Sequence, residues 1–422
     1  MGMKKAKIFY FTLQDEQTKE EKLEWFERTR FEDIPFDHIT PDQKANWINL
    51  TDNDFDELLP LIDKQVKSGK SEEAIFQLFS SGVKTQRDEW VYDFSKDALI
   101  ERMKYFVEVY QSNLGNSTKE KLDIKWDDDL VKYLKRGIKI YFDCSCIVRS
   151  QYRPFSKRFI YFNKYLNART YQWFDIFHVE KFNISIAINV GNPDFACLGS
   201  DLIFDLASLK FGNGTTQCLP LYRYDKNSNR IDNITDWGLN QIQTHYNDPT
   251  ITKENIFHYT YAILHHPTYR TKYELNLKRE FPRLPLYPNF HQWTTWGQTL
   301  MELHLNYETT QPHPLPQIQT ATKPNPKPKL KADKTTHIIT IDENTQLHNI
   351  PPLAWAYKLG NRSALEWILD QYKEKKPKDP TIAQLFNTYK FSDYKTQVID
   401  LLQRVCTVSL RTMEIIQTMP TE

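Results

Sequence analysis

Apolar residues recur at helical spacing along several stretches of this 422-residue chain. Two of these stretches open with a capping box, in which a Ser or Thr side chain and a Glu three residues later satisfy each other's backbone donors: Thr18 with Glu21, and Ser363 with Glu366. Pro267 separates two further helical patterns, because proline cannot continue a helix. The spacing predicts helices over residues 20–30, 52–66, 97–111, 256–266, 269–280, 293–305, 364–372, 394–405 and 409–419.

Shorter runs rich in β-branched and aromatic residues predict β-strands. These runs cover residues 6–13, 138–148, 182–196, 202–211 and 216–221, and residues 80–95 are predicted to form a loop with a short extended piece. Polar turns at 211–215 and 225–230 separate the central runs. The first strand has no hairpin partner before it, so we expect its sheet to be completed by another domain.

The combined pattern predicts an α+β fold with four parts. Residues 1–130 form an N-terminal helical segment, residues 131–308 a mixed, strand-rich central domain, and residues 337–422 a small C-terminal helical module. Between the last two, residues 309–336 contain six prolines and five lysines but no aromatic residue and no glycine. Such a composition is typical of an extended, semi-rigid linker.

A chain of this length, 40% of it apolar, can bury a substantial hydrophobic core. It contains no run of 18 uncharged apolar residues, and it enters its first strand without the apolar segment of a signal peptide. We therefore expect a soluble protein with no membrane contact. The five cysteines are an odd number spread over a long chain, which favours free thiols in the reducing cytoplasm.

The net charge of +1 conceals a strong segregation of charge along the chain. Residues 1–130 carry −9, residues 131–170 +9, residues 171–320 −3 and residues 321–422 +4. In the cationic block, aromatic side chains lie between the cations, and Asp143 is the only acid. The cations are Lys132, Lys135, Arg136, Lys139, Arg149, Arg153, Lys157, Arg158, Lys164 and Arg169. This composition is typical of a surface that neutralises DNA phosphates, although the same cations could instead pair with the acidic residues of 1–130.

Few residues indicate catalytic chemistry. The nearest match to the loop that holds the target amine in amino-methyltransferases is Asn192-Pro-Asp-Phe195, in which an acid replaces the second proline, and an ordinary turn is the alternative. The chain has only 12 glycines and no Walker-type loop, so it offers little material for a phosphate cradle. We interpret Cys144 and Cys146, on a predicted strand, and His265-His266, at a helix end, as packing residues and not as metal ligands. Consecutive acids at 127–129 are typical of a solvated helix start and not of a nuclease metal cluster.

Several longer motifs resemble those of a known group. The segment Ser150 to Arg158 (SQYRPFSKR) resembles the Tyr-Arg-Pro-Phe-Asp junction of fused restriction-modification enzymes, with Ser156 in place of Asp. Tyr261 to Tyr273 (YAILHHPTYRTKY), 277–285 and 302–305 resemble the hallmark run of the same group. Residues 350–367 (IPPLAWAYKLGNRSALEW) with 379–382 narrow the resemblance to the type ISP restriction-modification enzymes, over about residues 6 to 420.

This resemblance implies that the chain is the C-terminal specificity region of such an enzyme. The group joins a nuclease, an ATP-driven translocase, an adenine-N6 methyltransferase and a target-recognition domain in one polypeptide. The resemblance implies double-stranded DNA and the upstream domains as partners, and it makes the strand at 6–13 the last strand of the methyltransferase sheet. It implies no cofactor for this chain itself, with S-adenosylmethionine, ATP and Mg²⁺ serving the full enzyme. The alternatives are a degenerate adenine-N6 methyltransferase and a protein-interaction scaffold.

The cationic block supplies the candidate DNA contacts, because phosphate contacts set the register and a few side chains read base edges. We predict that five residues lie next to the DNA: Arg149, Tyr152, Arg153, Lys157 and Arg158. Arginine is the best candidate for bidentate contact to guanine, and Lys164 and Arg169 are assigned to phosphates. Arg153 could equally be a structural residue held against the core. The polar loops at Asn213 and at 227–230 could enter a groove, or could be ordinary solvent loops.

Overall fold

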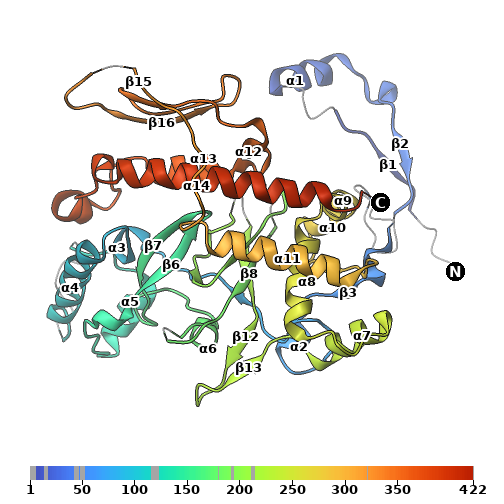
Figure 1. Cartoon of the computed structure of the whole chain (residues 1–422), viewed down its shortest axis with the longest axis horizontal. Helices are drawn as coiled ribbons and strands as arrows, with labels where there is room; N and C mark the ends of the chain where they lie inside the picture. Colours follow the sequence, from blue (N-terminus) through green and yellow to red (C-terminus); the bar gives the residue numbers. More distant parts are fainter. Residues whose placement is uncertain are drawn as a thin grey trace. The chain divides into compact units, whose positions relative to one another are not determined.

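The structure, a computed structural model, describes residues 6–13, 18–41, 47, 53–115, 123–178, 180–191, 194–210, 214–320 and 322–421 (Figure 1). The chain divides into two compact units, Met1–Asp56 and Glu57–Glu422. The mixture of helices and small sheets confirms the predicted α+β class. None of the helices among the described residues has both the length and the apolar character needed to cross a membrane.

The first unit pairs two short strands and carries one helix. Strand β1 (Ile8–Tyr10) is antiparallel to β2 (Asp37–Ile39), so the first strand does have a partner in the chain, which follows it instead of preceding it. Its place in a methyltransferase sheet stays a prediction. Helix α1 (Lys19–Arg28) begins at Thr18, and the predicted capping box with Glu21 is confirmed. The 3₁₀ turn η1 (Phe31–Asp33) follows.

Two four-stranded sheets form the centre of the second unit. The first has the order β10 (Ile203–Phe204), β6 (Ile147–Arg153), β7 (Ser156–Tyr161), β5 (Tyr92–Asp93). The second has the order β4 (Ser80–Ser81), β11 (Thr215–Pro220), β8 (Ser185–Val190), β9 (Cys197–Ser200). A tight hairpin joins β6 to β7 at Phe155, which is fully buried in spite of its positive φ of 52°. The junction motif SQYRPFSKR therefore forms this hairpin.

Two helices pack against each other beside these sheets (Figure 1). Helix α8 (Lys253–His265) has every residue from Ile256 onward buried, and α11 (Phe290–Leu305) crosses it at Gly297. A Cβ at Gly297 would lie 1.7 Å from the carbonyl oxygen of His258, so only glycine allows this approach. The predicted helix at 269–280 is shorter and divided, into α9 (Pro267–Lys272) and α10 (Glu274–Leu277).

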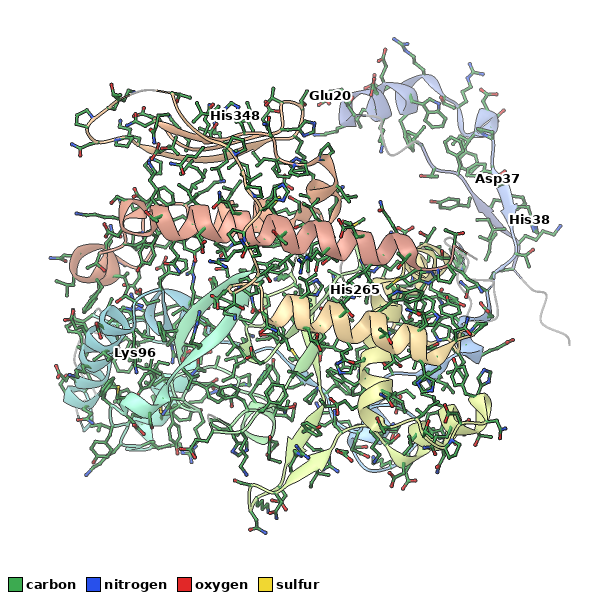
Figure 2. The ribbon with its side chains drawn as sticks, viewed as in Figure 1. Glu20, Asp37, His38, Lys96, His265 and His348 are labelled. Atoms are coloured by element: carbon green, nitrogen blue, oxygen red, sulfur yellow. The ribbon has the colours of Figure 1, made fainter. Side chains whose placement is uncertain are left out.

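Buried histidines connect these helices to the C-terminal helix. His304 lies between the Tyr261 hydroxyl, 2.5 Å from its Nδ1, and the Thr412 hydroxyl, 2.9 Å from its Nε2. His265, labelled in Figure 2, places Nδ1 2.8 Å from the carbonyl oxygen of Tyr261. Burial lowers the pKa of His304 to about 3 and lowers that of His265, so both rings are neutral. His265 is therefore a packing residue, as predicted.

The C-terminal part of the second unit contains a third four-stranded sheet. Its order is β15 (Gln317–Gln319), β18 (Thr345–Leu347), β17 (Ile338–Asp342), β16 (Pro328–Asp333). Residues 309–336, where composition predicts a linker, thus contain two strands, β15 and β16. These strands pair with β18 and β17. In β16 the exposed Lys329 and Lys331 flank the buried Leu330, an alternation that the surrounding prolines and lysines conceal in the sequence.

Three helices complete this part: α12 (Pro352–Ala356), α13 (Ala364–Gln371) and α14 (Phe391–Thr418). The capping box at Ser363 and Glu366 is confirmed at the start of α13. The two predicted helices at 394–405 and 409–419 are one continuous helix, α14, because Cys406 and Val408 between them are buried on its packed face. Strands β19 (Lys358–Leu359) and β20 (Arg362–Ser363) pair before α13.

Other predicted elements differ from the structure, and the strand predicted over 202–211 extends only over β10 (Ile203–Phe204) among the described residues. The helix predicted over 52–66 is broken at Pro60 into η2 (Asp54–Glu57), β3 (Leu59–Pro60) and α2 (Lys64–Lys67). The strand predicted over 138–148 begins only at Ile147, and Cys144–Cys146 forms the 3₁₀ turn η3. Cys144 is exposed there, so the core role expected for it is wrong. All five cysteines are free.

The remaining elements include the confirmed helix α4 (Lys96–Ser112). The others are α3 (Asp88–Val91), α5 (Asp128–Lys135), α6 (Trp173–Ile176), β12 (Tyr222–Tyr224), β13 (Arg230–Asp232), α7 (Asp236–Tyr246), β14 (Arg283–Leu284) and the π turn η4 (Ile382–Phe386). Helix α3 lies in the segment 80–95, where only a loop with a short extended piece is predicted.

Candidate nucleic-acid interface

Three hollows meet at the ring of Tyr152, the last residue but one of β6. Their volumes are about 260, 470 and 650 Å³. The first two also share Gln371 and Lys375, and the first and third share Glu89, so the three adjoin one another. We call them together the Tyr152 groove. One wall comes from α3, β5 and the β6–β7 hairpin, and the other from α13 and the residues that lead into α14.

Tyr152 is held rigidly in this groove. The guanidinium carbons of Arg153 and Arg158 lie 3.9 and 4.2 Å from its ring centroid. Its hydroxyl donates to Asp88 Oδ2 at 3.1 Å, and burial raises the pKa of Tyr152 to about 12, which keeps the hydroxyl a donor. Cation–π contact and the hydrogen bond together fix the ring in one orientation.

Arg153 makes a buried ion pair beneath Tyr152. Its Nη1 lies 2.7 Å from Asp205 Oδ1, and its side chain is only 16% exposed. The Asp205 carboxylate also accepts hydrogen bonds from the Tyr92 hydroxyl and the backbone N–H of Ala207. Burial raises the pKa of Asp205 to about 6 in spite of the guanidinium beside it. This geometry favours the structural role that the sequence left open for Arg153.

Arg158 lies in the smallest hollow between two rings. Its guanidinium carbon is 4.3 Å from the Phe94 ring centroid and 4.2 Å from that of Tyr152, and its Nη2 donates to the backbone carbonyl of Gln371 at 3.3 Å. Stacking on two rings fixes a guanidinium plane without neutralising its charge. Among the seven predicted residues, Arg158 therefore combines a fixed orientation with an available charge.

The other four predicted residues do not line the Tyr152 groove. Arg149 and Lys157 both bind the carboxylate of Glu308, at 3.1 and 3.0 Å. Arg169 pairs with Asp129 at 2.8 Å, and Lys164 is exposed with its Nζ 4.9 Å from the Tyr165 ring. The carboxylate partners thus come from several parts of the chain and not only from residues 1–130. DNA contact by each of the seven residues stays a prediction.

The groove also contains residues suited to DNA contact that sequence reasoning missed. Besides the buried, ion-paired Arg87 and Arg102, the added cations are Lys125, Lys210, Arg362, Lys373, Lys375, Lys376 and Lys378. Four of them belong to one run, Lys373-Glu-Lys-Lys-Pro-Lys378, which is the signal in the sequence that could have found them. The amides of Gln86 and Asn361 line the same groove, and an amide can make a bidentate contact with adenine.

Several other candidates lie elsewhere. Asn213, Asn192 and Pro193 lie outside the described residues. The loop at 227–230 is the turn between β12 and β13, where Asp225 accepts hydrogen bonds from the backbone of Asn227 and Asn229. Within the part of the chain that the structure describes, no three His, Cys, Asp or Glu side chains gather as a metal site would require. The groove therefore offers rings, amides and cations, which are the kinds of side chain that contact bases and phosphates in nucleic-acid complexes.

Solved structures similar to this chain contain DNA. A cryo-electron-microscopy structure of a DrdV–DNA complex matches 99% of this chain and 43% of that one, with 44% identity and a TM-score of 0.90. The Type ISP enzyme LlaBIII bound to DNA matches 91% of this chain and 25% of that one, with 28% identity and a TM-score of 0.79. A nuclease-deletion mutant of LlaGI with a DNA substrate mimic matches 98% and 33%, with 28% identity and a TM-score of 0.80.

The chain thus spans less than half the length of each of these proteins. No curated protein matches it in sequence. The family of Type ISP C-terminal specificity domains matches residues 74–401, a range that contains both walls of the Tyr152 groove. The match covers most of the chain and agrees with the resemblance of its motifs, so this protein belongs to the Type ISP C-terminal specificity domain family.

Proposed function

We propose that this chain binds duplex DNA and recognises a specific base sequence on behalf of a Type ISP restriction-modification enzyme. The observation that carries this proposal is its family membership over residues 74–401, a range that includes the cation- and ring-lined Tyr152 groove. Lysines in the groove supply sequence-independent contacts to phosphates, and arginine and amide groups supply contacts to base edges.

Three side chains are best placed for base readout. Arg158 has a fixed guanidinium plane, which suits bidentate contact to guanine O6 and N7. Gln86 is exposed at the rim of the largest hollow, with a φ of 58° that places it in the left-handed region. A non-glycine residue in this conformation is strained, and such strain is concentrated at functional positions. Asn361 lines the intermediate hollow.

Catalysis belongs, in this proposal, to parts of the enzyme beyond this chain. The chain positions a target adenine for a methyltransferase domain that extracts the base from the duplex. S-adenosylmethionine, ATP and Mg²⁺ serve those parts, whereas the residues of this chain bind and orient the DNA. The free cysteines fit a cytoplasmic location.

Selection from random DNA tests the proposal without knowledge of the target site. The full chain is incubated with duplexes that carry a randomised segment, and bound duplexes are recovered and amplified over several rounds. We expect a common motif that contains an adenine, and tighter binding of that duplex than of its scrambled version at every salt concentration. Equal affinity for the two duplexes would contradict sequence-specific recognition.

Tyr152 provides a site-directed prediction. We expect Tyr152→Leu to reduce the preference for the selected duplex over the scrambled one about tenfold, which corresponds to about 1.4 kcal/mol, because Arg158 loses one of the two rings that orient it. Competition binding with both duplexes measures this ratio. The control Tyr152→Phe keeps the ring and loses only the hydrogen bond to Asp88, so it should retain most of the preference. If Tyr152→Leu leaves the ratio of the two affinities unchanged, the orientation of Arg158 by the Tyr152 ring does not contribute to base recognition.

A further inference from the structure

The residues between α13 and α14 form one wall of the Tyr152 groove. We call residues 373–378 the lysine segment. Lys373, Lys375 and Lys376 line the smallest hollow, Lys375 also lines the second, and Lys378 lines the third. In Figure 1 the start of α14 lies on the same side of the second unit as α3, which belongs to the opposite wall. One short segment therefore contributes a cation to each of the three hollows.

These lysines keep their charge available. The Lys373 and Lys375 side chains are 45% and 62% exposed, and their ammonium groups lie 3.9 and 3.6 Å from the same carboxylate, Asp370. Lys376 and Lys378 are exposed, and no ion pair joins either one to a carboxylate of the described residues. Lys157, in contrast, is 10% exposed and lies 3.0 Å from Glu308. Weakly paired, hydrated ammonium groups are the ones that can exchange counterions for DNA phosphates.

The lysine segment is fixed to the opposite wall by a latch. The two carboxylate oxygens of Glu89, in α3, accept hydrogen bonds from the backbone N–H groups of Lys378 and Asp379, each at 2.9 Å. The indole of the neighbouring Trp90 donates to Asp379 Oδ2 at 2.8 Å. At the other side, Glu374 accepts a hydrogen bond from the backbone N–H of Phe391, the first residue of α14. The segment is thus held at both ends while its lysine side chains remain exposed.

Arg158, which lines the smallest hollow, has one donor that the described part of the protein leaves unsatisfied. Arg158 Nε is buried and has no hydrogen-bond partner among the described residues. Buried donors are nearly always satisfied, so an unsatisfied one beside a hollow requires an explanation. The two acids that line this hollow are already engaged: Glu89 accepts backbone N–H groups, and Asp93 pairs with Arg102. The hollow around Arg158 therefore combines an unsatisfied donor with three surrounding lysines.

We propose that the lysine segment is the phosphate-binding wall of the DNA groove, held in place by the Glu89 and Trp90 latch. This inference rests on the proposed DNA-binding function and names the part of the DNA that the wall contacts, the sugar–phosphate backbone. Lysine contacts phosphate as a point charge and carries no planar fork for reading bases. The lysine segment therefore adds affinity and register, and discrimination between sequences comes from groove residues outside this segment.

Neutralising the segment tests this assignment. The full chain carrying Lys373→Gln, Lys375→Gln, Lys376→Gln and Lys378→Gln is titrated with the selected and the scrambled duplex at several salt concentrations. We expect both affinities to fall by the same factor, about tenfold or more. The slope of log affinity against log salt should become shallower by about 0.9 for each phosphate that the variant no longer neutralises. The ratio of the two affinities should remain that of the wild type.

A matched control removes the same charge elsewhere in the same unit. Lys323, Lys327, Lys329 and Lys331 lie in or beside the third sheet and do not line the Tyr152 groove. Replacing these four lysines with Gln should leave the slope of log affinity against log salt equal to that of the wild type. If the fourfold variant of the lysine segment keeps the wild-type salt slope, the inference is overturned. It is also overturned if only the affinity for the selected duplex falls. Failure of the proposed function is distinct, because it would appear as equal affinities in the wild type itself.

The latch has its own test, in which charge and geometry predict opposite results. E89Q removes a negative charge from the groove, so charge alone would strengthen DNA binding. The latch predicts weaker binding of both duplexes and a shallower salt slope, because an amide offers one acceptor oxygen where the carboxylate offers two. Tighter binding by E89Q would overturn the latch. Circular dichroism establishes that each variant is folded.

Discussion

Replacing Gly297 with alanine is expected to reduce the free energy of unfolding by about 3 kcal/mol or more. The new Cβ on α11 would lie 1.7 Å from the carbonyl oxygen of His258 and 2.5 Å from its carbon. Both atoms belong to the backbone of α8, so no side chain can rotate away and the two helices must separate. Urea denaturation followed by tryptophan fluorescence measures the loss, because Trp293 and Trp296 lie on α11 itself.

Gly199→Ala provides the control for this prediction. Its Cβ would lie 2.2 Å from the sulfur of Met301, which is also too close, but here the obstacle is the end of a flexible side chain. We expect a smaller loss, about 1 kcal/mol, because methionine can adopt another rotamer. Equal losses in the free energy of unfolding of the two variants would show that the close backbone contact between α8 and α11 does not cause the larger effect expected for Gly297→Ala.

Replacing Arg153 with methionine is expected to destabilise the protein by about 3 kcal/mol at neutral pH, because it leaves the Asp205 carboxylate buried without its cation. Burial already raises the pKa of Asp205, and the loss of the guanidinium raises it further. In the unfolded chain the pKa of Asp205 is near the ordinary 3.8, and in the folded variant it is higher. The folded variant is therefore stabilised by protonated Asp205 below pH 3.8, and it loses this stability as the pH rises through the folded pKa. The deficit of Arg153→Met should therefore be small near pH 4.5 and complete near pH 8.

Denaturation curves at these two pH values measure the effect, and the double variant R153M/D205N isolates its cause. With no carboxylate at 205, the double variant should lose the pH dependence and recover part of the stability. The same experiment separates the two roles predicted for Arg153. A contact that serves DNA alone would leave the stability of R153M unchanged and would reduce only DNA affinity.

Local signals in the sequence were sufficient for much of the secondary structure. The capping boxes at Thr18 and Ser363 mark the starts of α1 and α13, because the hydrogen bonds that define them join residues three positions apart. Strand partners are different, because they depend on which distant segments the core brings together. The parallel pairing of β10 with β6 and the antiparallel pairing of β5 with β7 join segments far apart in the chain, and no local pattern predicts them.

The candidate site was only partly predictable for the same reason. The density of rings and cations in the block at 131–170 identified Tyr152 and Arg158, which the fold places in the groove. It could not identify which cations remain available, because Arg149 and Lys157 are paired with Glu308, a residue outside that block. The run at 373–378 was missed because a charged run is usually a solvated surface, and only the tertiary structure brings it to face Tyr152.

The Glu89 latch has a consequence for the timing of synthesis. It joins Glu89 to Lys378 and Asp379, which follow it 289 and 290 positions later in the chain. A ribosome completes α3 long before it reaches Lys378, and during that interval the nascent chain carries a single wall. Affinity for DNA should therefore arise only after residues 373–379 have been synthesised, which would keep shorter nascent chains from occupying the genome.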